Sequence, residues 1–291
     1  MLYMDSGSEY HYGRSLSGFM RKYLILLLLN IPILCMAKAE RVISLAPHTT
    51  ELAYTAGLGD NLVAVSEYSN YPPQAQKLEK VANYQGINVE RILELQPDLV
   101  IVWRSGNSPK DIEKLKQFGI NLFYSDPQSL EDIANDIEKL SAFAKSPQIG
   151  FRAAQNFKKQ LIATKEKYQK QNQVRYFYQL SSIPLMTVSQ GKWPSEVFSF
   201  CGGENIFSDA DIAYPQVSIE QIAVRNPEII FTSEQSPTQV EVWQQWSNHI
   251  EAIKQQHVYP LDTSILSRPT PRVITAIEQI CHYFSVIQQK T

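Results

Sequence analysis

The sequence predicts an α/β protein with two lobes, each with a mostly parallel sheet flanked by helices, joined by one long linking helix. Three observations lead to this prediction. Short strand-like segments alternate with helical segments along the chain, which is typical of a parallel sheet with helices on its faces. A phrase that begins at Asn88 is nearly repeated from Ser218. Between the two copies lies one long helical segment.

Residues 1–39 are expected to form a leader that precedes the folded part. Arg21 and Lys22 stand before an apolar segment at residues 24–34, and small residues end the leader at Ala39. This is the pattern of a secretory signal peptide, and its apolar segment is shorter than the roughly 20 residues that a membrane-spanning helix needs. Residues 1–19 add a polar extension that a signal peptide does not need, so we expect translation to start at Met20 and cleavage to follow Ala39.

The N-terminal lobe is expected at residues 40–145. Its strand-like and helical segments alternate regularly, so that each helix connects two neighbouring strands. The predicted strands are residues 41–46, 62–67, 98–103 and 120–125. The predicted helices are residues 49–57, 89–96, 111–118 and 129–144.

The linking helix is expected at residues 146–172. Ser146 followed by Pro147 is a helix start signal, and apolar residues recur at helical spacing from Phe151 to Ile162 before the segment turns polar. A single helix has few soft dihedral angles. We therefore expect the two lobes to move only modestly against each other.

The C-terminal lobe is expected at residues 173–291. It repeats the alternation of the first lobe. The predicted strands are residues 174–180, 228–233 and 257–262, and the predicted helices are residues 195–201, 219–225, 238–249 and 271–287.

The repeated phrase reads NVERILELQPDLVI at residues 88–101 and SIEQIAVRNPEIIF at residues 218–231. In both copies a capping residue begins a short helix, a proline follows the helix, and an acidic residue leads into a buried strand. Glu90 and Glu220 fall in the first turn, where a carboxylate stabilises the helix dipole without any partner. Alternatively, two lobes related by approximate two-fold symmetry present the two glutamates as docking points for a partner with two equivalent halves.

Motifs of the common enzyme classes are missing from the sequence. There is no G-x-S-x-G, no H-E-x-x-H and no G-x-x-x-x-G-K, and no glycine-rich phrase follows the first strand. We therefore predict no catalytic residues. The net charge of −2 argues against nucleic acid as a partner, because nucleic-acid binding needs a basic surface.

Histidines are too dispersed to predict a metal site. His48 follows the first predicted strand and has the side chain most often used for metals. However, His249, His257 and His282 are expected on other elements, and a metal site needs several ligands at one place.

Two cysteines follow the leader, Cys201 and Cys281. In a secreted protein they are expected to form a disulfide, closing a loop of about 80 residues and contributing roughly 4.5 kcal/mol in the chain-entropy model. The alternative is two separately buried thiols.

Aromatic residues recur near the ends of predicted strands and in loops. Tyr68 and Tyr71 follow the second strand, Tyr84 lies in the next loop, Trp103 closes the third strand, and Tyr214 lies in a loop of the second lobe. Open parallel sheets bind ligands at the carboxyl ends of their strands, and flat rings give a large contact area at low entropic cost. These residues would suit a bulky, partly apolar ligand with a polar edge. Simple packing of loops is the alternative for any one of them.

Several phrases resemble a known family: RVISLAPHTTELAYTAGL, EYSNYPPQAQKLEKVANYQGINVERILELQPDLVIVWRSGN, CGGENIF, YPQVSIEQ and PRVITAIEQIC. From about Arg41 to the last helix, the chain is similar to the periplasmic cobalamin-binding proteins of ABC importers. These belong to a helix-linked class that also serves haem, siderophores and metals. The resemblance implies a monomer in the periplasm that binds cobalamin or a related corrinoid between its lobes. It also implies a Cys201–Cys281 disulfide and delivery to a permease dimer in the inner membrane.

The resemblance also implies roles for individual residues. The cobalt arrives already held by the corrin, so no protein cofactor or metal ligand is implied. Glu90 and Glu220 match the glutamates that meet arginines of the permease. The implied ligand-contacting positions are Tyr68, Tyr84, Trp103, Leu180, Met186, Tyr214 and a loop from Ser264 to Arg268.

Some of these positions depart from the best-known member of the family. Tyr84 and Tyr214 replace tryptophans, Ser264 replaces an acidic residue, and Leu180 and Met186 stand where phenylalanines are expected. These changes bear on affinity and on preference among corrinoids.

Three other functions stay open from the sequence. A haem or ferric-siderophore receptor of the same class would share the fold. A ligand-sensing periplasmic domain could use the same two glutamates. A periplasmic hydrolase on a two-lobed scaffold is the third.

Overall fold

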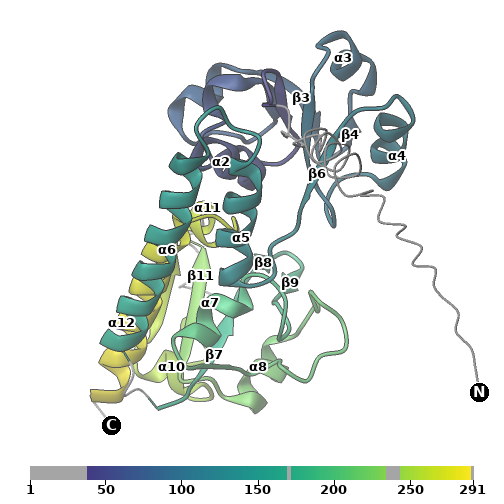
Figure 1. The fold of residues 1–291 in the computed structure, drawn as a ribbon. Coiled ribbons are helices and arrows are strands. Elements are labelled where there is room, and N and C mark those ends of the chain that lie inside the picture. The colour runs from purple at the N-terminus through teal and green to yellow at the C-terminus, as the bar shows by residue number, and fades with distance from the viewer. Residues whose placement is uncertain (1–37, 169–171, 234–242, 290–291) are drawn as a thin grey trace, which may run out of the picture. The chain divides into compact units, whose positions relative to one another are not determined.

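The computed structural model describes residues 38–168, 172–233 and 243–289, which belong to one compact unit. The expected start at Met20 and most of the signal peptide lie outside the described residues. Two sheets and one long helix give the α/β fold class that the sequence predicts (Figure 1). Within the described residues, none of the helices combines the length and the apolar surface that a membrane span requires.

The sheet of the N-terminal lobe has the strand order β4-β3-β2-β1-β5-β6 and is parallel except for β4. The strands of its centre are buried on both faces, as the LVIVW sequence of β5 requires. The strands are β1 Val42–Ser44, β2 Leu62–Ser66, β3 Glu79–Asn83, β4 Gly86–Ile87, β5 Leu99–Trp103 and β6 Leu122–Ser125.

Helices cover both faces of this sheet. Ser129 begins α5 with a capping box, because its hydroxyl accepts from Asp132 N and the Asp132 carboxylate accepts from Ser129 N. Two short 3₁₀ helices, Gly59–Asn61 and Pro73–Lys77, lie in the connections. The α-helices are α2 Pro47–Thr55, α3 Val89–Glu94, α4 Pro109–Gln117 and α5 Leu130–Ser141.

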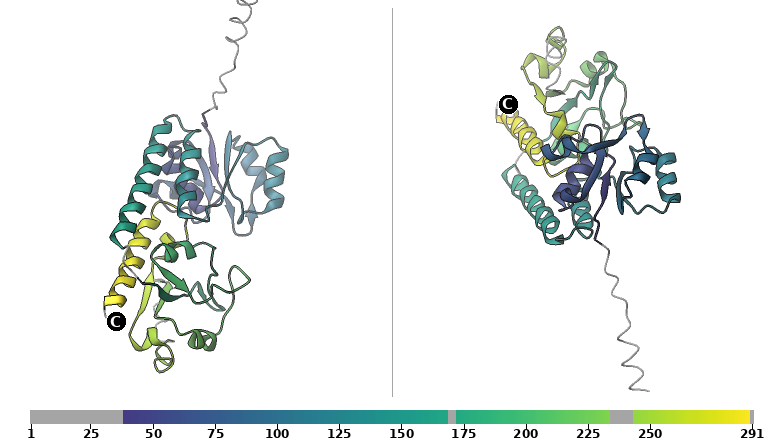
Figure 2. Two further views of the ribbon diagram at one scale, coloured as in Figure 1. Left: turned by 60° about the horizontal axis from the view of Figure 1, so that its bottom comes forward. Right: turned by 90° about the horizontal axis from the view of Figure 1, so that it is seen from above.

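The long helix α6, Pro147–Lys167, follows the first lobe and begins with a proline at its first position. It runs beside α5 in Figures 1 and 2 and packs against it. Residues 169–171 of the expected linking helix lie outside the described part of the chain.

The sheet of the C-terminal lobe is parallel, with the order β10-β7-β11-β12. A disulfide between Cys201 and Cys281 joins the end of α7 to α12, which confirms the predicted pairing. The strands are β7 Val174–Tyr178, β8 Ser181–Ser182, β9 Leu185–Met186, β10 Gly203–Asn205, β11 Ile229–Ser233 and β12 Val258–Leu261, of which β8 and β9 form a separate hairpin. The helices are α7 Ser195–Phe200, α8 Ile219–Arg225, α10 Glu251–Lys254, α11 Thr263–Leu266 and α12 Val273–Gln289.

One hydrophobic core runs through both lobes on the side of the long helices. Leu52 and Ile137 contribute from the first lobe, and Phe198 and Phe284 from the second. Phe157 of α6 is 1% exposed within the same cluster. The core of the linking helix is therefore continuous with the cores of both lobes.

The structure differs from the predicted elements in several places. The helix expected at 238–249 lies partly on residues 234–242, outside the described residues. Over 245–249 it is wrong, because these residues form turns and a short helix begins only at Glu251. Ser247 and Asn248 favour turns over helix interiors, which accounts for the difference. Residues 263–266, expected as a loop, form the helix α11.

Candidate ligand-binding cleft

A cleft with a volume of about 450 Å³ lies between the two lobes. The carboxyl ends of β5 and β6 reach it from the first sheet, and the end of β7 from the second, as expected for ligand sites of parallel sheets. From the N-terminal lobe it is lined by Pro47, His48, Trp103, Ser105, Asp126, Pro127 and Gln128. From the C-terminal lobe it is lined by Tyr178, Leu180, Trp193, Pro194, Tyr214, Ser267, Arg268 and Pro269.

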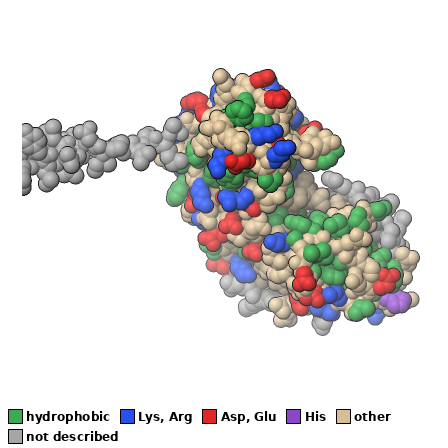
Figure 3. Space-filling view, turned by 90° about the vertical axis from the view of Figure 1, so that its right-hand side faces the viewer, with side chains coloured by type: hydrophobic (Ala, Val, Ile, Leu, Met, Phe, Trp, Pro, Cys, Tyr) green, Lys and Arg blue, Asp and Glu red, His purple; other side chains and the backbone are tan. Residues whose placement is uncertain are grey.

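Apolar side chains also reach the surface outside the cleft. Figure 3 shows hydrophobic side chains gathered on part of the face seen from the right-hand side of Figure 1. Ile183, Ile212 and Val224 are exposed apolar residues of the C-terminal lobe. This lobe therefore offers an apolar surface as well as a cleft wall.

Trp103 forms the main aromatic surface of the N-terminal wall and is 38% exposed. Its backbone N–H donates to Asn107 Oδ1 at 2.8 Å. Its indole Nε1 donates to Asp126 Oδ1 at 3.2 Å. With both ends of the residue held, the ring is presented to the cleft in one orientation, which lowers the entropic cost of stacking a ligand on it.

His48 lies behind Trp103, with its ring edge-on to the indole at a centroid distance of 5.4 Å. The imidazole is buried, and its Nε2 has no hydrogen-bond partner among the described residues. Burial, and then the charge of Arg268, lower the pKa of His48 from 6.5 to about 3. The ring is therefore neutral at physiological pH.

The C-terminal wall carries Tyr214 and Trp193. Trp193 Nε1 donates to Leu266 O at 2.9 Å, and the Tyr214 hydroxyl donates to Trp193 O at 3.5 Å. Burial, and then the charge of Asp126, raise the pKa of Tyr214. The hydroxyl is therefore protonated, with its hydrogen directed at Trp193 O, and its oxygen can accept a hydrogen bond from a ligand.

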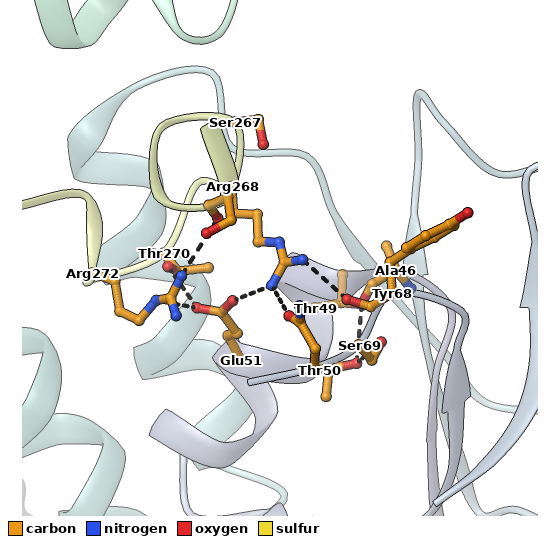
Figure 4. Close-up of polar contacts among 12 residues, drawn as sticks. Ala46, Thr49, Thr50, Glu51, Tyr68, Ser69, Ser267, Arg268, Thr270 and Arg272 are labelled. Carbon is orange, nitrogen blue, oxygen red and sulfur yellow. Dashed lines mark hydrogen bonds and ion pairs between the residues drawn. The ribbon is translucent and has the colours of Figure 1, made fainter. Parts of the chain in front are cut away.

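A buried group of charged side chains joins the lobes beside the cleft (Figure 4). The Glu51 side chain of α2 is 2% exposed, and its Oε1 accepts from Arg268 Nη1 at 2.9 Å. Its Oε2 accepts from Thr270 Oγ1 at 3.0 Å and lies 3.2 Å from Arg272 Nε. We call these four residues the interlobe cluster. Removing one partner of such a buried ion pair typically costs 3–5 kcal/mol, about the scale expected here.

Arg268 also fixes the loop after β2. Its Nη1 donates to Asn70 Oδ1 at 2.7 Å, and its Nη2 donates to Tyr68 O at 3.0 Å. Tyr68 has a φ of 60°, a left-handed conformation that is uncommon for tyrosine. Both terminal nitrogens of Arg268 therefore donate to oxygen atoms of the N-terminal lobe.

Buried hydroxyl groups support the same loop from below. Ser44 Oγ lies 2.7 Å from Thr50 Oγ1, and Thr50 Oγ1 lies 2.9 Å from Ser69 Oγ. Ser69 Oγ in turn lies 3.0 Å from Ser66 Oγ. This chain links the end of β1, the start of α2 and the end of β2, so the loop that carries Tyr68 is anchored on both sides.

The residues expected from the sequence to contact a ligand divide into two groups. Trp103, Leu180, Tyr214 and Arg268 line the cleft together. The others lie outside its lining: Tyr68 and Tyr84 are 72% and 85% exposed, Met186 is in β9 and Ser264 is in α11. Tyr84 lines a neighbouring hollow that shares Ser105 with the cleft.

The sequence reasoning assigned no ligand role to Trp193, Asp126 or Glu51. Glu51 has a local signal, because it is a carboxylate directly before Leu52 and Ala53 on a helix face that is buried. A charged residue within a buried face indicates a buried partner. Asp126 directly follows the predicted strand at residues 120–125, a position that favours ligand contact in parallel sheets, whereas Trp193 lies in a loop without a comparable signal.

The two docking candidates occupy equivalent positions in the two lobes. Glu90 is exposed in the first turn of α3, and Glu220 is exposed in the first turn of α8. A hydrogen bond with Ser218 lowers the pKa of Glu220. Figure 1 draws α3 at the upper right and α8 near the middle of its lower part.

The repeated phrase builds the same contacts in each lobe. Gln96 and Asn226 end the two helices with φ values of 45° and 44°. Asp98 Oδ1 accepts from Arg41 N at 3.1 Å at the start of β1. Glu228 Oε2 accepts from Arg175 N at 2.9 Å at the start of β7, although Asp98 and Glu228 differ in length. The repeat therefore has a structural role in addition to presenting two glutamates.

A family model described as periplasmic binding protein matches residues 42–264. The chain belongs to the periplasmic binding protein family. This periplasmic binding protein is 54% identical over 251 residues to the vitamin B12-binding protein of Vibrio parahaemolyticus, covering 86% of this chain and 91% of that protein. It is 43% identical over 263 residues to the vitamin B12-binding protein of Yersinia pseudotuberculosis, covering 90% and 92%.

Solved structures give the same result for this periplasmic binding protein. The periplasmic vitamin B12 binding protein BtuF of Vibrio cholerae is 50% identical, with a TM-score of 0.84 over 86% of this chain and 98% of that one. The periplasmic haem-binding protein BhuT is 19% identical, with a TM-score of 0.75 over 86% and 99%. The second likeness concerns the fold alone. The family resemblance read from the sequence is therefore confirmed.

Proposed function

We propose that this periplasmic binding protein binds cobalamin or a related corrinoid in its interlobe cleft and delivers it to the permease dimer of an ABC importer. The observation that carries the proposal is the similarity to vitamin B12-binding proteins, at 54% identity over 251 residues, in a chain whose family match contains residues of both cleft walls. The aromatic lining supports it, because a flat macrocycle can stack against Trp103 and Tyr214 from opposite lobes.

The proposed ligand contacts lie in two regions, one inside the cleft and one at its mouth. Trp103, Leu180, Tyr214 and Arg268 line the cleft. Because the cleft is open and of modest volume, it holds part of such a ligand, and the rest would lie at the mouth. There the exposed rings of Tyr68 and Tyr84 would cover it, with Met186 and Ser264 further from the centre.

The remaining features of the proposal follow from this role. The protein would act as a monomeric carrier without catalysis in the periplasm, reached through the cleaved leader. Glu90 and Glu220 would dock to the permease. The cobalt would stay within the corrin, so the protein would need no metal ligand of its own.

Gel filtration with an absorbance spectrum tests the proposal. The purified protein is incubated with excess cyanocobalamin and passed through the column, with haem in a parallel run. We expect the corrinoid spectrum to elute with the protein at close to one equivalent. Elution of protein without corrinoid, or retention of haem alone, would contradict the proposal.

A further inference from the structure

Among the ionisable side chains that line the cleft, one charged group has no ion-pair partner within the described residues. Burial lowers the pKa of His48 to about 3 and raises the pKa of Tyr178 and Tyr214, so these three are neutral at physiological pH. Arg268 is paired within the interlobe cluster at 2.9 Å. Asp126 has no ion-pair partner in the described part of the chain, and its contacts are hydrogen bonds from neutral groups.

Asp126 directly follows β6 and lines the cleft. Its Oδ1 accepts from Trp103 Nε1 at 3.2 Å and from Ser105 Oγ at 2.6 Å. Neither donor carries a charge, so neither offsets the charge of the carboxylate. Its electrostatic effect reaches the opposite lobe, because Asp126 adds to the effect of burial in raising the pKa of Tyr214.

The arginines nearby do not offer an anion a ready partner. Arg268 Nη1 and Nη2 donate to Glu51, Asn70 and the Tyr68 carbonyl, as Figure 4 shows for Glu51 and Tyr68. Arg272 does not line the cleft, and its Cζ lies 4.0 Å from the centre of the Tyr71 ring. The interlobe cluster carries one net positive charge, but the guanidinium at the cleft is already occupied by protein oxygens.

We propose that Asp126 sets the charge specificity of the cleft, favouring macrocycles with neutral amides on their rim over macrocycles with carboxylates. This inference rests on the proposed function and refines its substrate class. An amide N–H of a corrinoid can donate to the carboxylate in a charge-assisted hydrogen bond. A ligand carboxylate, such as a haem propionate, would instead be repelled.

Cyanocobalamin and its monocarboxylic acids test the inference, because each acid differs from the parent only by hydrolysis of one rim propionamide. Dissociation constants are measured for every ligand with the wild type and with Asp126→Asn. We expect the wild type to bind at least one acid more weakly than cyanocobalamin. Asp126→Asn should lower the ratio of that acid's dissociation constant to that of cyanocobalamin by about tenfold, the scale of one like-charge contact in a partly solvated site. If haem binds, the ratio of its dissociation constant to that of cyanocobalamin should also be lower for Asp126→Asn than for the wild type.

Asp60→Asn is the matched control. Asp60 lies just before β2, at the opposite edge of the sheet from the cleft, and the substitution removes the same charge from the protein. Asp60→Asn should leave the ratio of each acid's dissociation constant to that of cyanocobalamin unchanged. Equal ratios for Asp126→Asn and the wild type would overturn the inference while leaving corrinoid binding intact. Failure of the wild type to bind cyanocobalamin would instead overturn the proposed function.

A measurement on the wild type covers the case in which Asp126→Asn does not fold. Salt screens repulsion between partly exposed charges. The preference for cyanocobalamin over the most disfavoured acid should therefore fall as ionic strength rises. A preference that is independent of salt would contradict electrostatic discrimination by Asp126.

Discussion

At the scale of single residues, the buried imidazole of His48 makes the stability of this protein sensitive to acid. Its pKa is about 3 in the folded chain, against the ordinary 6.5. The unfolded chain therefore takes up a proton below about pH 6.5, whereas the folded chain does not until near pH 3. By linkage, the contribution of His48 to the free energy of unfolding is highest above pH 6.5 and falls as the pH drops towards 3.

His48→Gln should remove this dependence. We expect the stability of the wild type, relative to the variant, to fall by about 2 kcal/mol between pH 7.5 and pH 5. Urea unfolding of both proteins at a series of pH values measures the difference. A constant difference over this range would show that the imidazole is not held neutral by the fold.

Trp103 provides a second residue-scale prediction, on ligand affinity. Trp103→Ala should weaken cyanocobalamin binding by about 1–3 kcal/mol, because a large ring surface in the cleft is lost. Trp103→Phe keeps a ring but loses the hydrogen bond to Asp126, so it should lose less affinity than Trp103→Ala. Calorimetric dissociation constants give the comparison. Wild-type affinity in both variants would remove Trp103 from the binding surface.

The role of a residue could be predicted where the neighbouring sequence carries a recognisable pattern. Trp103 could be predicted, because an aromatic at a strand end has a recognisable position in the sequence, whereas the role of Tyr214, in a loop before α8, was implied by the family resemblance. The pairing of Glu51 with Arg268 spans 217 positions, and no local pattern specifies which distant charge meets a buried carboxylate. The exposure of Tyr68 and Tyr84 depends on loop conformation, which sequence periodicity does not encode.

At the scale of elements, the interlobe cluster ties α2 to the segment between α11 and α12. Glu51→Gln should lower the free energy of unfolding by about 3 kcal/mol, because two arginines would lose their shared buried carboxylate. Thermal unfolding followed by circular dichroism measures the loss. Glu113→Gln, at an exposed position of α4, is the control and should change little. Equal melting temperatures for wild type and Glu51→Gln would contradict this role.

Strong periodic elements could be predicted from the sequence, and strands with a weak hydrophobic pattern could not. The predicted strand at 98–103 corresponds to β5, and the predicted helix at 219–225 corresponds to α8. The unpredicted β3 has the sequence EKVAN, in which only Val81 and Ala82 are buried. Strand β3 lies between β2 and the two-residue β4, and it is specified by pairing with β2 rather than by its own pattern.

At the scale of the whole described unit, α6 and the continuous core favour a cleft that exists before the ligand arrives. Phe157 of α6 is buried in a cluster with side chains of both lobes. The interlobe cluster adds polar contacts between the same lobes. Opening the cleft widely would disrupt both, so we expect only small lobe movement on binding.

The paired glutamates give a prediction for the complete import system. Glu90→Lys combined with Glu220→Lys should abolish binding to the permease while leaving corrinoid affinity unchanged, since both residues lie outside the cleft lining. Pull-down with the permease and calorimetry with cyanocobalamin give the two readouts. Glu131→Lys with Glu204→Lys makes the same change in net charge at other exposed positions and should retain binding. Full permease binding by the first variant would contradict the docking role.

Calorimetric titration with cyanocobalamin tests the central claim most directly, that two aromatic-lined lobes hold one corrinoid between them. We expect the wild type to bind one equivalent at micromolar concentration or below. Trp103→Ala combined with Tyr214→Ala, which removes a ring from each wall, should bind far more weakly. No heat from the wild type, or equal binding by the double variant, would contradict the claim.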